Sequence, residues 1–519
     1  MQKTIFLLVL LLTLANAANA QEWIRYYGNG YWSQNVIECY DKGYIITGIR
    51  LDGKCSCIIK TDINGNLLWE KRIGNGQYHI FAKNIEQTPD NGFIIGGTTT
   101  KINNRQDPFI FKLNSCGEVE WCKIIYTPLV GDDLGRMVKP ASDGGYVLLG
   151  LLNDPSQQRR VNLYKLDHNG ELEWHYFYPP DSLMFDEDLY WLNVDVEGYL
   201  ITGDGYYPEP GQTGGGYLRP YYIKTDTAGN ELWKLPFGVD TGYIGILGKT
   251  TISAHGDYYS VGPDYLTDIP ALIKVSHNGI PSCYHDIGNT NGGAVSPNFL
   301  NDTTLVILAG STVGVTTHII MYKTDTLANI IATADFPDFV SNYFDNTKTF
   351  DNKFVNIASR HMGSIYQILA FKVNSNLEYD TLYSHPFVYD SLCPYAIASD
   401  TIDLDCGLIV NVEEPFENPR SQQLKIFPNP AGDKLTISFP TYLLKNTKTG
   451  GLASGTVFYQ WKSTTLEIYD LTGKQIYSKE IRFDEKELEI DVSQWTPGMY
   501  AALLMYNGQT LGSGKLMVE

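Results

Sequence analysis

Up to about residue 380, short apolar runs recur along the chain, and Gly, Asp or Asn interrupts them at regular points. In residues 58–69 (IIKTDINGNLLW), two apolar stretches flank a polar segment that contains Asn-Gly. Runs of β-branched and aromatic residues of this length, bounded by turn residues, are typical of short strands. Each copy therefore predicts a β-hairpin, because Asn and Gly tolerate the positive φ that a tight turn needs.

A lysine after the first apolar stretch marks each copy, and successive lysines lie about 50 residues apart. A second pattern precedes each lysine: a turn, an apolar run and a Gly exit, as in residues 90–97 (DNGFIIGG). A repeat of this length with about four strands is typical of a propeller blade. The pattern predicts an all-β chain that begins with a seven-bladed β-propeller and ends with a small antiparallel β-sandwich. The marker lysines are Lys60, Lys112, Lys165, Lys224, Lys274, Lys323 and Lys372.

A tryptophan follows the turn in several copies, and we expect it to pack between neighbouring sheets, where a large ring fills the gap. These residues are Trp69, Trp121, Trp174 and Trp233. The repeat resembles the tryptophan-docking repeats of quinoprotein-type propellers and, more loosely, the Asp-box of sialidases. An Asp-box has one residue between Asp and Gly, whereas here there are two, so that likeness implies a shared turn only. Residues 23–28 copy the strand after the turn, and we expect them to pair with the last blade and close the ring.

The two ends of the chain carry patterns of their own. Residues 1–20 have the charge, apolar run and Ala-Asn-Ala site of a secretory signal peptide, and the apolar run is shorter than the roughly 20 residues of a membrane span. No later segment is long enough for a transmembrane helix. Residues 21–412 form the predicted propeller with its closing segment. Residues 413–423 are rich in Pro, Glu and Gln, which predicts a linker, and residues 424–519 form the predicted C-terminal domain.

The C-terminal domain shows alternating strands and several short motifs, which predict a small antiparallel β-sandwich. These motifs resemble the type A sorting domain of the type IX secretion system. The resemblance implies a transport signal that the outer-membrane translocon recognises and a sortase commonly removes, leaving the protein secreted or attached to the cell surface. The alternative is an adhesion sandwich that stays on the protein. The motif residues are Pro428, Asn429, Pro430, Asp470, Gly473, Gly498, Tyr500 and Lys515.

Eight cysteines in an exported chain indicate disulfides, although sequence alone leaves their connectivity open. The pairing that we predict is Cys393 with Cys406, because both lie in a segment after the seventh copy that has little repeat character. Cys116 and Cys122 flank a tight turn, so a bond between them is the other pairing considered. The remaining four are not assigned: Cys39, Cys55, Cys57 and Cys283.

The formal net charge of −19 argues against a nucleic-acid partner, since phosphate binding needs a basic face. Motifs for a serine nucleophile, a phosphate loop or a zinc protease are missing from the sequence, and we expect no cofactor and no metal. Asp62 and its neighbours hint at a calcium loop, but the run stops before the bidentate Glu that such a loop needs. Acidic residues do occur in predicted loops: Asp132, Asp133, Asp186, Glu187, Asp188 and Asp264.

The fourth copy is the longest, and residues 205–221 give it an aromatic, Gly-rich insertion. We expect this flap to overhang the ligand-bearing face, where Tyr206, Tyr207, Tyr217 and Arg219 bind a sugar or a peptide. The sequence therefore favours an exported, non-catalytic propeller with an unknown glycan, peptide or protein ligand. The alternative is a secreted hydrolase or lyase whose acidic residues converge in the channel. A quinone-dependent dehydrogenase is a third and weaker hypothesis, because no cofactor-binding residues can be matched.

Overall fold

The computed structural model divides into two compact units, and the division along the chain falls between Val412 and Glu413, at the start of the predicted linker. It describes residues 21–102, 104–126, 132–153, 159–179, 184, 186–208, 216–236, 248–264, 269–288, 292–313, 316–362, 365–385, 387–410, 424–439, 446–453, 456–470, 474–481, 487–506 and 509–519. The predicted signal peptide and linker lie outside these residues. The described residues contain no helix, and so none that is long and apolar enough to cross a membrane.

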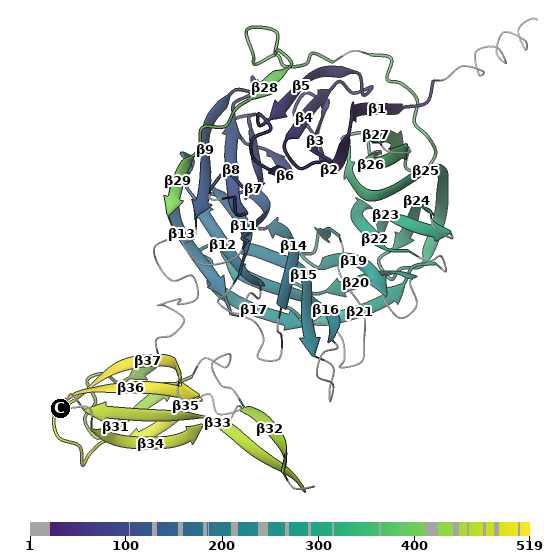
Figure 1. The fold of residues 1–519 in the computed structure, drawn as a ribbon. Coiled ribbons are helices and arrows are strands. Elements are labelled where there is room, and N and C mark those ends of the chain that lie inside the picture. The colour runs from purple at the N-terminus through teal and green to yellow at the C-terminus, as the bar shows by residue number, and fades with distance from the viewer. Residues whose placement is uncertain are drawn as a thin grey trace, which may run out of the picture. The chain divides into compact units, whose positions relative to one another are not determined.

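The first unit consists of β-sheets that stand side by side around a ring, which is the arrangement of a β-propeller (Figure 1). The end strands β2, β6, β14 and β22 lie toward the centre of the ring, and β5, β9, β13 and β17 lie toward its rim. The first two sheets contain β2 (Tyr31–Glu38), β3 (Tyr44–Arg50), β4 (Ser56–Thr61), β5 (Leu67–Ile73) and β28 (Asp400–Ile402), then β6 (Ile80–Gln87), β7 (Phe93–Thr99), β8 (Asp107–Leu113), β9 (Val119–Tyr126) and β29 (Gly407–Val410).

Three four-stranded sheets follow in sequence order, each with antiparallel neighbours. They contain β10 (Leu134–Pro140), β11 (Tyr146–Asn153), β12 (Arg159–Leu166) and β13 (Leu172–Tyr178); β14 (Asp186–Val194), β15 (Gly198–Pro208), β16 (Gly216–Asp226) and β17 (Glu231–Pro236); and β18 (Thr250–Ile252), β19 (Tyr258–Asp264), β20 (Ile269–Val275) and β21 (Pro281–Asp286).

The last sheet of the ring has seven strands in the order β1-β27-β26-β25-β24-β23-β22. Its long strand β25 pairs with β24 through its first half and with β26 through its second half. One strand therefore belongs both to the strands β22–β24 and to the strands β26, β27 and β1. The bounds are β1 (Ile24–Asn29), β22 (Ala294–Asn301), β23 (Thr304–Val313), β24 (Thr316–Asp325), β25 (Ile330–Lys348), β26 (Phe354–Met362) and β27 (Ile365–Val373).

The core of the first unit lies between adjacent sheets. Strands in the middle of a sheet, such as β7 and β8, are buried along their whole length, because neighbouring sheets cover both of their faces. One apolar cluster joins Ile94 and Ile110 of the second sheet to Val138 and Leu148 of the third. This is why the middle strands read as continuous apolar runs in the sequence.

The marker lysine of the repeat is an internal ion-pair partner. Lys60 is 1% exposed, and its Nζ lies 2.6 Å from the carboxylate of Asp41, which belongs to the turn between β2 and β3. A buried ammonium is stable only when it is paired and hydrogen-bonded, so the lysine ties the third strand of its sheet to the first turn. The same pairing joins Lys112 to Asp90, Lys165 to Asp143, Lys224 to Asp195, Lys274 to Asp257 and Lys372 to Asp351.

The predicted packing of tryptophans between sheets is confirmed. Each ring covers the turn glycine of the next sheet: Trp69 lies over Gly117, Trp121 over Gly170, Trp174 over Gly229 and Trp233 over Gly279. A side chain at Gly170, which has a φ of +80°, would meet the Trp121 ring at 2.6 Å, so both the conformation and the space require glycine there.

The predicted closure of the ring by the N-terminal strand is also confirmed. Strand β1 pairs antiparallel with β27, so the first strand of the chain completes the last group of strands. Trp23 then takes the position of the repeat tryptophan: it is 1% exposed, covers Gly65 of the first sheet, and donates its indole N–H to the carbonyl of Ile63 at 2.7 Å. Closure of this kind removes an open sheet edge.

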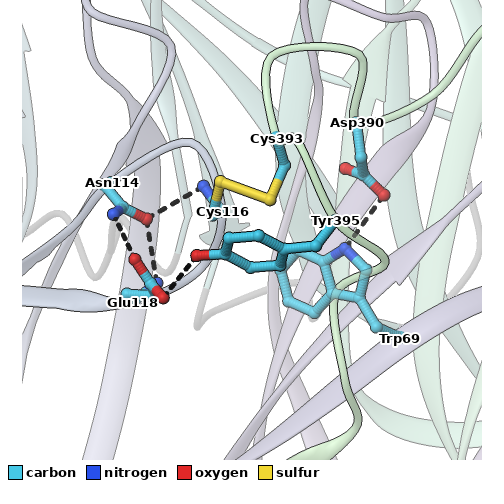
Figure 2. Close-up of a disulfide and its surroundings, with 7 residues drawn as sticks. All are labelled: Trp69, Asn114, Cys116, Glu118, Asp390, Cys393 and Tyr395. Carbon is cyan, nitrogen blue, oxygen red and sulfur yellow. Dashed lines mark hydrogen bonds between the residues drawn. A yellow bond between two sulfur atoms is a disulfide. The ribbon is translucent and has the colours of Figure 1, made fainter.

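After β27 the chain continues as a strap (residues 380–385 and 387–410), whose later part runs along the rim of the first two sheets. Within the strap, β28 adds in parallel to β5, and β29 adds in parallel to β9. Figure 2 shows one attachment, where the hydroxyl of Tyr395 donates to Glu118 at 2.5 Å and the indole of Trp69 donates to Asp390 at 3.2 Å. The strap therefore covers edge strands that the repeat alone leaves open.

Two disulfides fix the strap to the second sheet, and they correct the predicted pairing. Cys393 is bonded to Cys116 (Figure 2), and Cys406 is bonded to Cys122. The predicted bond between Cys393 and Cys406 is wrong, and so is the alternative bond between Cys116 and Cys122. The strap lies in register beside β9, so each strap cysteine meets a cysteine of the β8–β9 hairpin and not the other strap cysteine. Cys39, Cys55 and Cys57 are buried free thiols, and the side chain of Cys283 is outside the described part.

The C-terminal unit contains two sheets that share one apolar core, which includes Leu435, Ile437, Leu466 and Leu504. The strands are β30 (Lys425–Phe427), β31 (Lys434–Ser438) and β35 (Glu487–Asp491) in one sheet, and β32 (Asn446–Ala453), β33 (Thr456–Asp470), β34 (Gln475–Ile481), β36 (Gly498–Tyr506) and β37 (Gln509–Val518) in the other.

Candidate functional site

The predicted flap is an extension of the two middle strands of the β14–β17 sheet. β15 and β16 remain paired from Gly198 with Asp226 up to Pro208 with Gly216, beyond the first residue of β14. Asp186, at the start of β14, lies directly across from Tyr206. The base of the flap and the start of the inner strand are therefore neighbours.

The four predicted ligand-binding residues differ in their surroundings. Tyr207 is only 2% exposed and belongs to the apolar cluster between the β10–β13 and β14–β17 sheets. Arg219 is 8% exposed, and its guanidinium lies 4.9 Å from the centroid of the Tyr207 ring, so these two side chains contact each other in the interior. Tyr206 is partly exposed, and for Tyr217 the structure describes only the backbone, which pairs with Tyr207. Ligand binding by these residues stays a prediction. Because Tyr207 and Arg219 are buried, Tyr206 and Tyr217 are the two candidates that remain.

Beside the flap lies a group of paired charges, which we call the inner-strand cluster: Arg136, Arg159, Asp186 and Asp188. Arg159 donates from Nη2 to Asp186 at 2.8 Å and from Nη1 to Asp188 at 2.6 Å, and its backbone N–H also donates to Asp186 at 2.8 Å. Arg136 forms an ion pair with the other oxygen of Asp188. The four side chains are 19% to 34% exposed, so they remain in contact with solvent.

Sequence reasoning found the two aspartates of this cluster but not the two arginines. A signal for them does exist, because contacts between inner strands join residues about one repeat apart: Arg136 pairs with Asp188, and Lys139 pairs with Glu86. Opposite charges at equivalent positions of successive copies therefore indicate contacts across a sheet boundary.

Two other acidic residues, Glu187 and Asp107, have buried side chains. Glu187 is fully buried; it accepts the Val161 N–H at 3.0 Å with one oxygen, and the other oxygen has no hydrogen-bond partner among the described residues. Burial raises the pKa of Glu187 to about 8, although the Val161 amide and the charge of Arg160 favour the ionised form. Burial likewise raises the pKa of Asp107 to about 7, and the nearby charge of Asp133 adds to the effect. Neither group reaches solvent freely.

The remaining acidic candidates have structural partners or lie outside the description. Asp132 accepts the Gln106 N–H at 3.0 Å, and Asp133, which is 3% exposed, accepts the Asn153 N–H at 3.1 Å. For Asp264 only the backbone is described. The Asp62 carboxylate accepts the N–H groups of Asn64 and Asn66, so it caps its own turn. Within the described residues, no group of three or more His, Cys, Asp or Glu side chains is placed to hold a metal ion.

In the C-terminal unit, the structure brings several motif residues together. The Asn429 side chain donates to the carbonyl of Lys515 at 2.9 Å and accepts the Met517 N–H at 2.8 Å, so the Pro428–Pro430 loop is bound to β37. Asp470 lies across from Tyr500 in the β33–β36 pair, and Gly498 begins β36. Gly473 is outside the described residues. A groove of about 600 Å³ lies beside Asn429 and Lys515. Its other lining residues are Leu424, Ile426, Ala501, Leu503, Ser513 and Gly514.

Residues 425–519 match the family model described as "Secretion system C-terminal sorting domain". This match agrees with the motifs at the same positions, so the C-terminal unit is a type IX sorting domain and the protein is exported, to be secreted or attached to the cell surface. No curated protein matches the chain.

Several solved structures are similar to the chain in backbone. A protein of unknown function from Dyadobacter fermentans DSM 18053 is 10% identical with a TM-score of 0.39, and the alignment covers 67% of this chain and 98% of that one. Drosophila Semaphorin 2a is 10% identical with a TM-score of 0.40, covering 96% and 98%. A PL25 ulvan lyase is 10% identical with a TM-score of 0.41, covering 68% and 96%. At these values the likenesses carry no inference about ligand or activity.

Proposed function

We propose that the exported protein is a non-catalytic binding protein: a seven-bladed β-propeller that carries a ligand face, followed by a small β-sandwich that serves as its sorting domain. The count of seven rests on β25, whose halves pair with different neighbours, so that the last seven-stranded sheet contains two four-stranded blades. The β-sandwich rests on the two sheets that share one core. The translocon and sortase of the type IX system are the proposed partners during export.

One observation supports the proposed position of the ligand face. The register of β14 and β15 places Tyr206 directly across from Asp186, so the aromatic flap adjoins the solvent-accessible inner-strand cluster. Aromatic surface next to a few fixed polar groups is typical of ligand sites. The loops at this end of the sheets also differ most in length between copies, and variable loops on a fixed scaffold are where binding residues usually lie.

The paired charges favour binding over hydrolysis. A general base or a nucleophilic carboxylate must offer a lone pair to the substrate or to water. Asp186 and Asp188 each accept hydrogen bonds from arginine, which occupy the oxygens that such chemistry would use. The alternative function, a secreted hydrolase or lyase with an acidic site in the propeller channel, requires these ion pairs to open.

The test is an array of glycans and peptides probed with the full chain, with the variant Tyr206→Ala/Tyr217→Ala, and with Tyr26→Ala as a matched control. Tyr26 is 44% exposed on β1, at the rim. We expect wild type and Tyr26→Ala to bind the same ligand class and the double variant to bind about tenfold more weakly, because stacking on an aromatic ring contributes roughly 1 kcal/mol or more. Unchanged binding by the double variant would remove the flap from the ligand face, and release of shorter products from bound glycans would favour the hydrolase or lyase.

A further inference from the structure

Lys83 is a third cation in the region of the inner-strand cluster, because its strand β6 packs against β10, which carries Arg136. It lies on β6, the inner strand of the second sheet, and its side chain is partly exposed. Its ammonium lies 5.9 Å from the centroid of the Phe81 ring. Unlike the other cations in this region, the Lys83 ammonium makes no hydrogen bond or ion pair with the described residues.

Lys83 differs from the two arginines in lacking an ion pair with the described residues. Arg136 and Arg159 pair with Asp186 and Asp188, and a third carboxylate, that of the buried Asp204, lies across from Asp188. An ammonium that is partly removed from water without a counter-ion is unfavourable. Burial lowers the pKa of Lys83 to about 8, and the charge of Arg136 lowers it further while Asp188 opposes both effects. An anionic group bound here would supply the partner that the Lys83 ammonium lacks.

We propose that the inner strands β6, β10 and β14 bind the carboxylate or sulfate group of an acidic saccharide, with Lys83 as the charge that contacts it. This inference rests on the proposed binding function and names its ligand class. Lys83 on β6 and Arg136 on β10 come from neighbouring sheets, so the anion is held across a sheet boundary by these two inner strands.

The aromatic rings beside these cations favour a saccharide over an acidic peptide. Phe81 lies next to the Lys83 ammonium, and the Arg136 guanidinium lies 5.5 Å from the centroid of the Tyr190 ring. A pyranose ring has a flat C–H face that packs on such rings while its acidic substituent reaches the ammonium. The flap supplies a further partly exposed ring, Tyr206, next to Asp186.

The test measures binding of the full chain by titration calorimetry at pH 7 to four probes: oligogalacturonate, a sulfated dextran oligosaccharide, neutral maltoheptaose and oligoglutamate. The variants are Lys83→Met, Lys83→Arg and, as a matched control, Lys54→Met, which changes an exposed lysine in the loop after β3. We expect Lys83→Met to lose at least tenfold in affinity for whichever acidic saccharide binds, and Lys83→Arg to stay within about threefold, because a charge-assisted hydrogen bond contributes about 1.5–3 kcal/mol. Lys54→Met should bind as wild type does.

Two further readouts separate binding from folding. Lys83→Met should melt at the same temperature as wild type or higher, since it removes an unmatched charge. Wild-type affinity for the acidic probe should fall as the pH rises from 7 to 9, because Lys83 loses its proton in that range, and Lys83→Arg should not show this fall.

Each outcome decides one proposal. Preference for the carboxylated or the sulfated probe identifies the anion. Binding of maltoheptaose alone, or equal binding by Lys83→Met, overturns this inference and leaves the proposed function standing. Equal or tighter binding of oligoglutamate overturns the saccharide assignment. Binding of none of these probes, together with an empty glycan and peptide array, overturns the proposed function as well.

Discussion

Glu187 makes a strong prediction about stability, because its burial holds a proton that the unfolded chain releases. The change is Glu187→Gln, which keeps the shape of the side chain and the acceptor for the Val161 N–H but removes the ionisable group. Burial raises the pKa of Glu187 from 4.5 to about 8. Between these two values the folded protein binds the proton and the unfolded chain does not, so stability falls as pH rises and the loss is complete above about pH 8.

The magnitude follows from the size of the pKa shift. One pKa unit corresponds to about 1.36 kcal/mol, so the shift of Glu187 sets an upper limit of roughly 5 kcal/mol between pH 4.5 and pH 9. Relaxation around the charge and entry of water reduce such penalties, and we expect about 2–3 kcal/mol. Glu187→Gln should therefore unfold at a higher denaturant concentration than wild type at pH 9, and the two proteins should converge toward pH 5.

The assay is urea unfolding followed by tryptophan fluorescence at pH 5, 7 and 9. Glu197→Gln is the matched control, because Glu197 is exposed on the turn before β15 in the same sheet. Asp107, whose pKa is also raised, contributes to the pH dependence of every variant, so the difference between Glu187→Gln and wild type isolates Glu187. Parallel profiles for wild type and Glu187→Gln across this pH range would refute the reasoning.

Three other predictions follow from the packing. Lys60→Met should destabilise the protein by about 3–5 kcal/mol, because it leaves the Asp41 carboxylate buried and unpaired. Lys60→Met/Asp41→Asn should lose less stability. A double variant that is no more stable than the single one in urea unfolding would contradict this. Trp69→Ala should cost about 3–5 kcal/mol and Trp121→Ala less, because Trp69 is 1% exposed and Trp121 is partly exposed; equal losses in the same assay would be the contrary result. Mass spectrometry of peptides from the unreduced protein should link Cys116 to Cys393 and Cys122 to Cys406, and Cys393→Ser should cost about 2–5 kcal/mol; a peptide that joins Cys393 to Cys406 would overturn the pairing.

The sequence predicts most of the ring because each copy encodes its own sheet locally. Asn-Gly turns, β-branched runs and the tryptophan are all set within one unit, and the leftover strand at residues 23–28 shows where the ring closes. The sorting domain was predicted from motifs that act within a few residues, such as the loop that Asn429 ties to β37.

The strap could not be predicted, because its contacts depend on distant parts of the chain. The strap lacks the repeat pattern, and the contacts that hold its later part lie far earlier in the chain, as in the bond from Cys393 to Cys116 with a separation of 277. Two cysteines close in sequence therefore gave a misleading pairing. The flap shows the same limit: its composition indicated binding, but only the packing of two sheets determines that Tyr207 and Arg219 face inward.

The two ends of the sheets differ in chemistry, and this difference supports the ligand face that we propose. At one end, the turn before β3 and the turn after β4 meet, since Tyr44 pairs with Thr61. The polar groups there already have partners within the protein: Lys60 forms an ion pair with Asp41, and the Asp62 carboxylate accepts hydrogen bonds from its own turn. Away from that end lie loops of unequal length, arginines that pair with aspartates, and the Lys83 ammonium, which lies midway along β6 and has no ion pair with the described residues. Since a bound anion gains most where a positive charge has no internal partner, the surroundings of Lys83 support the anion site that we propose.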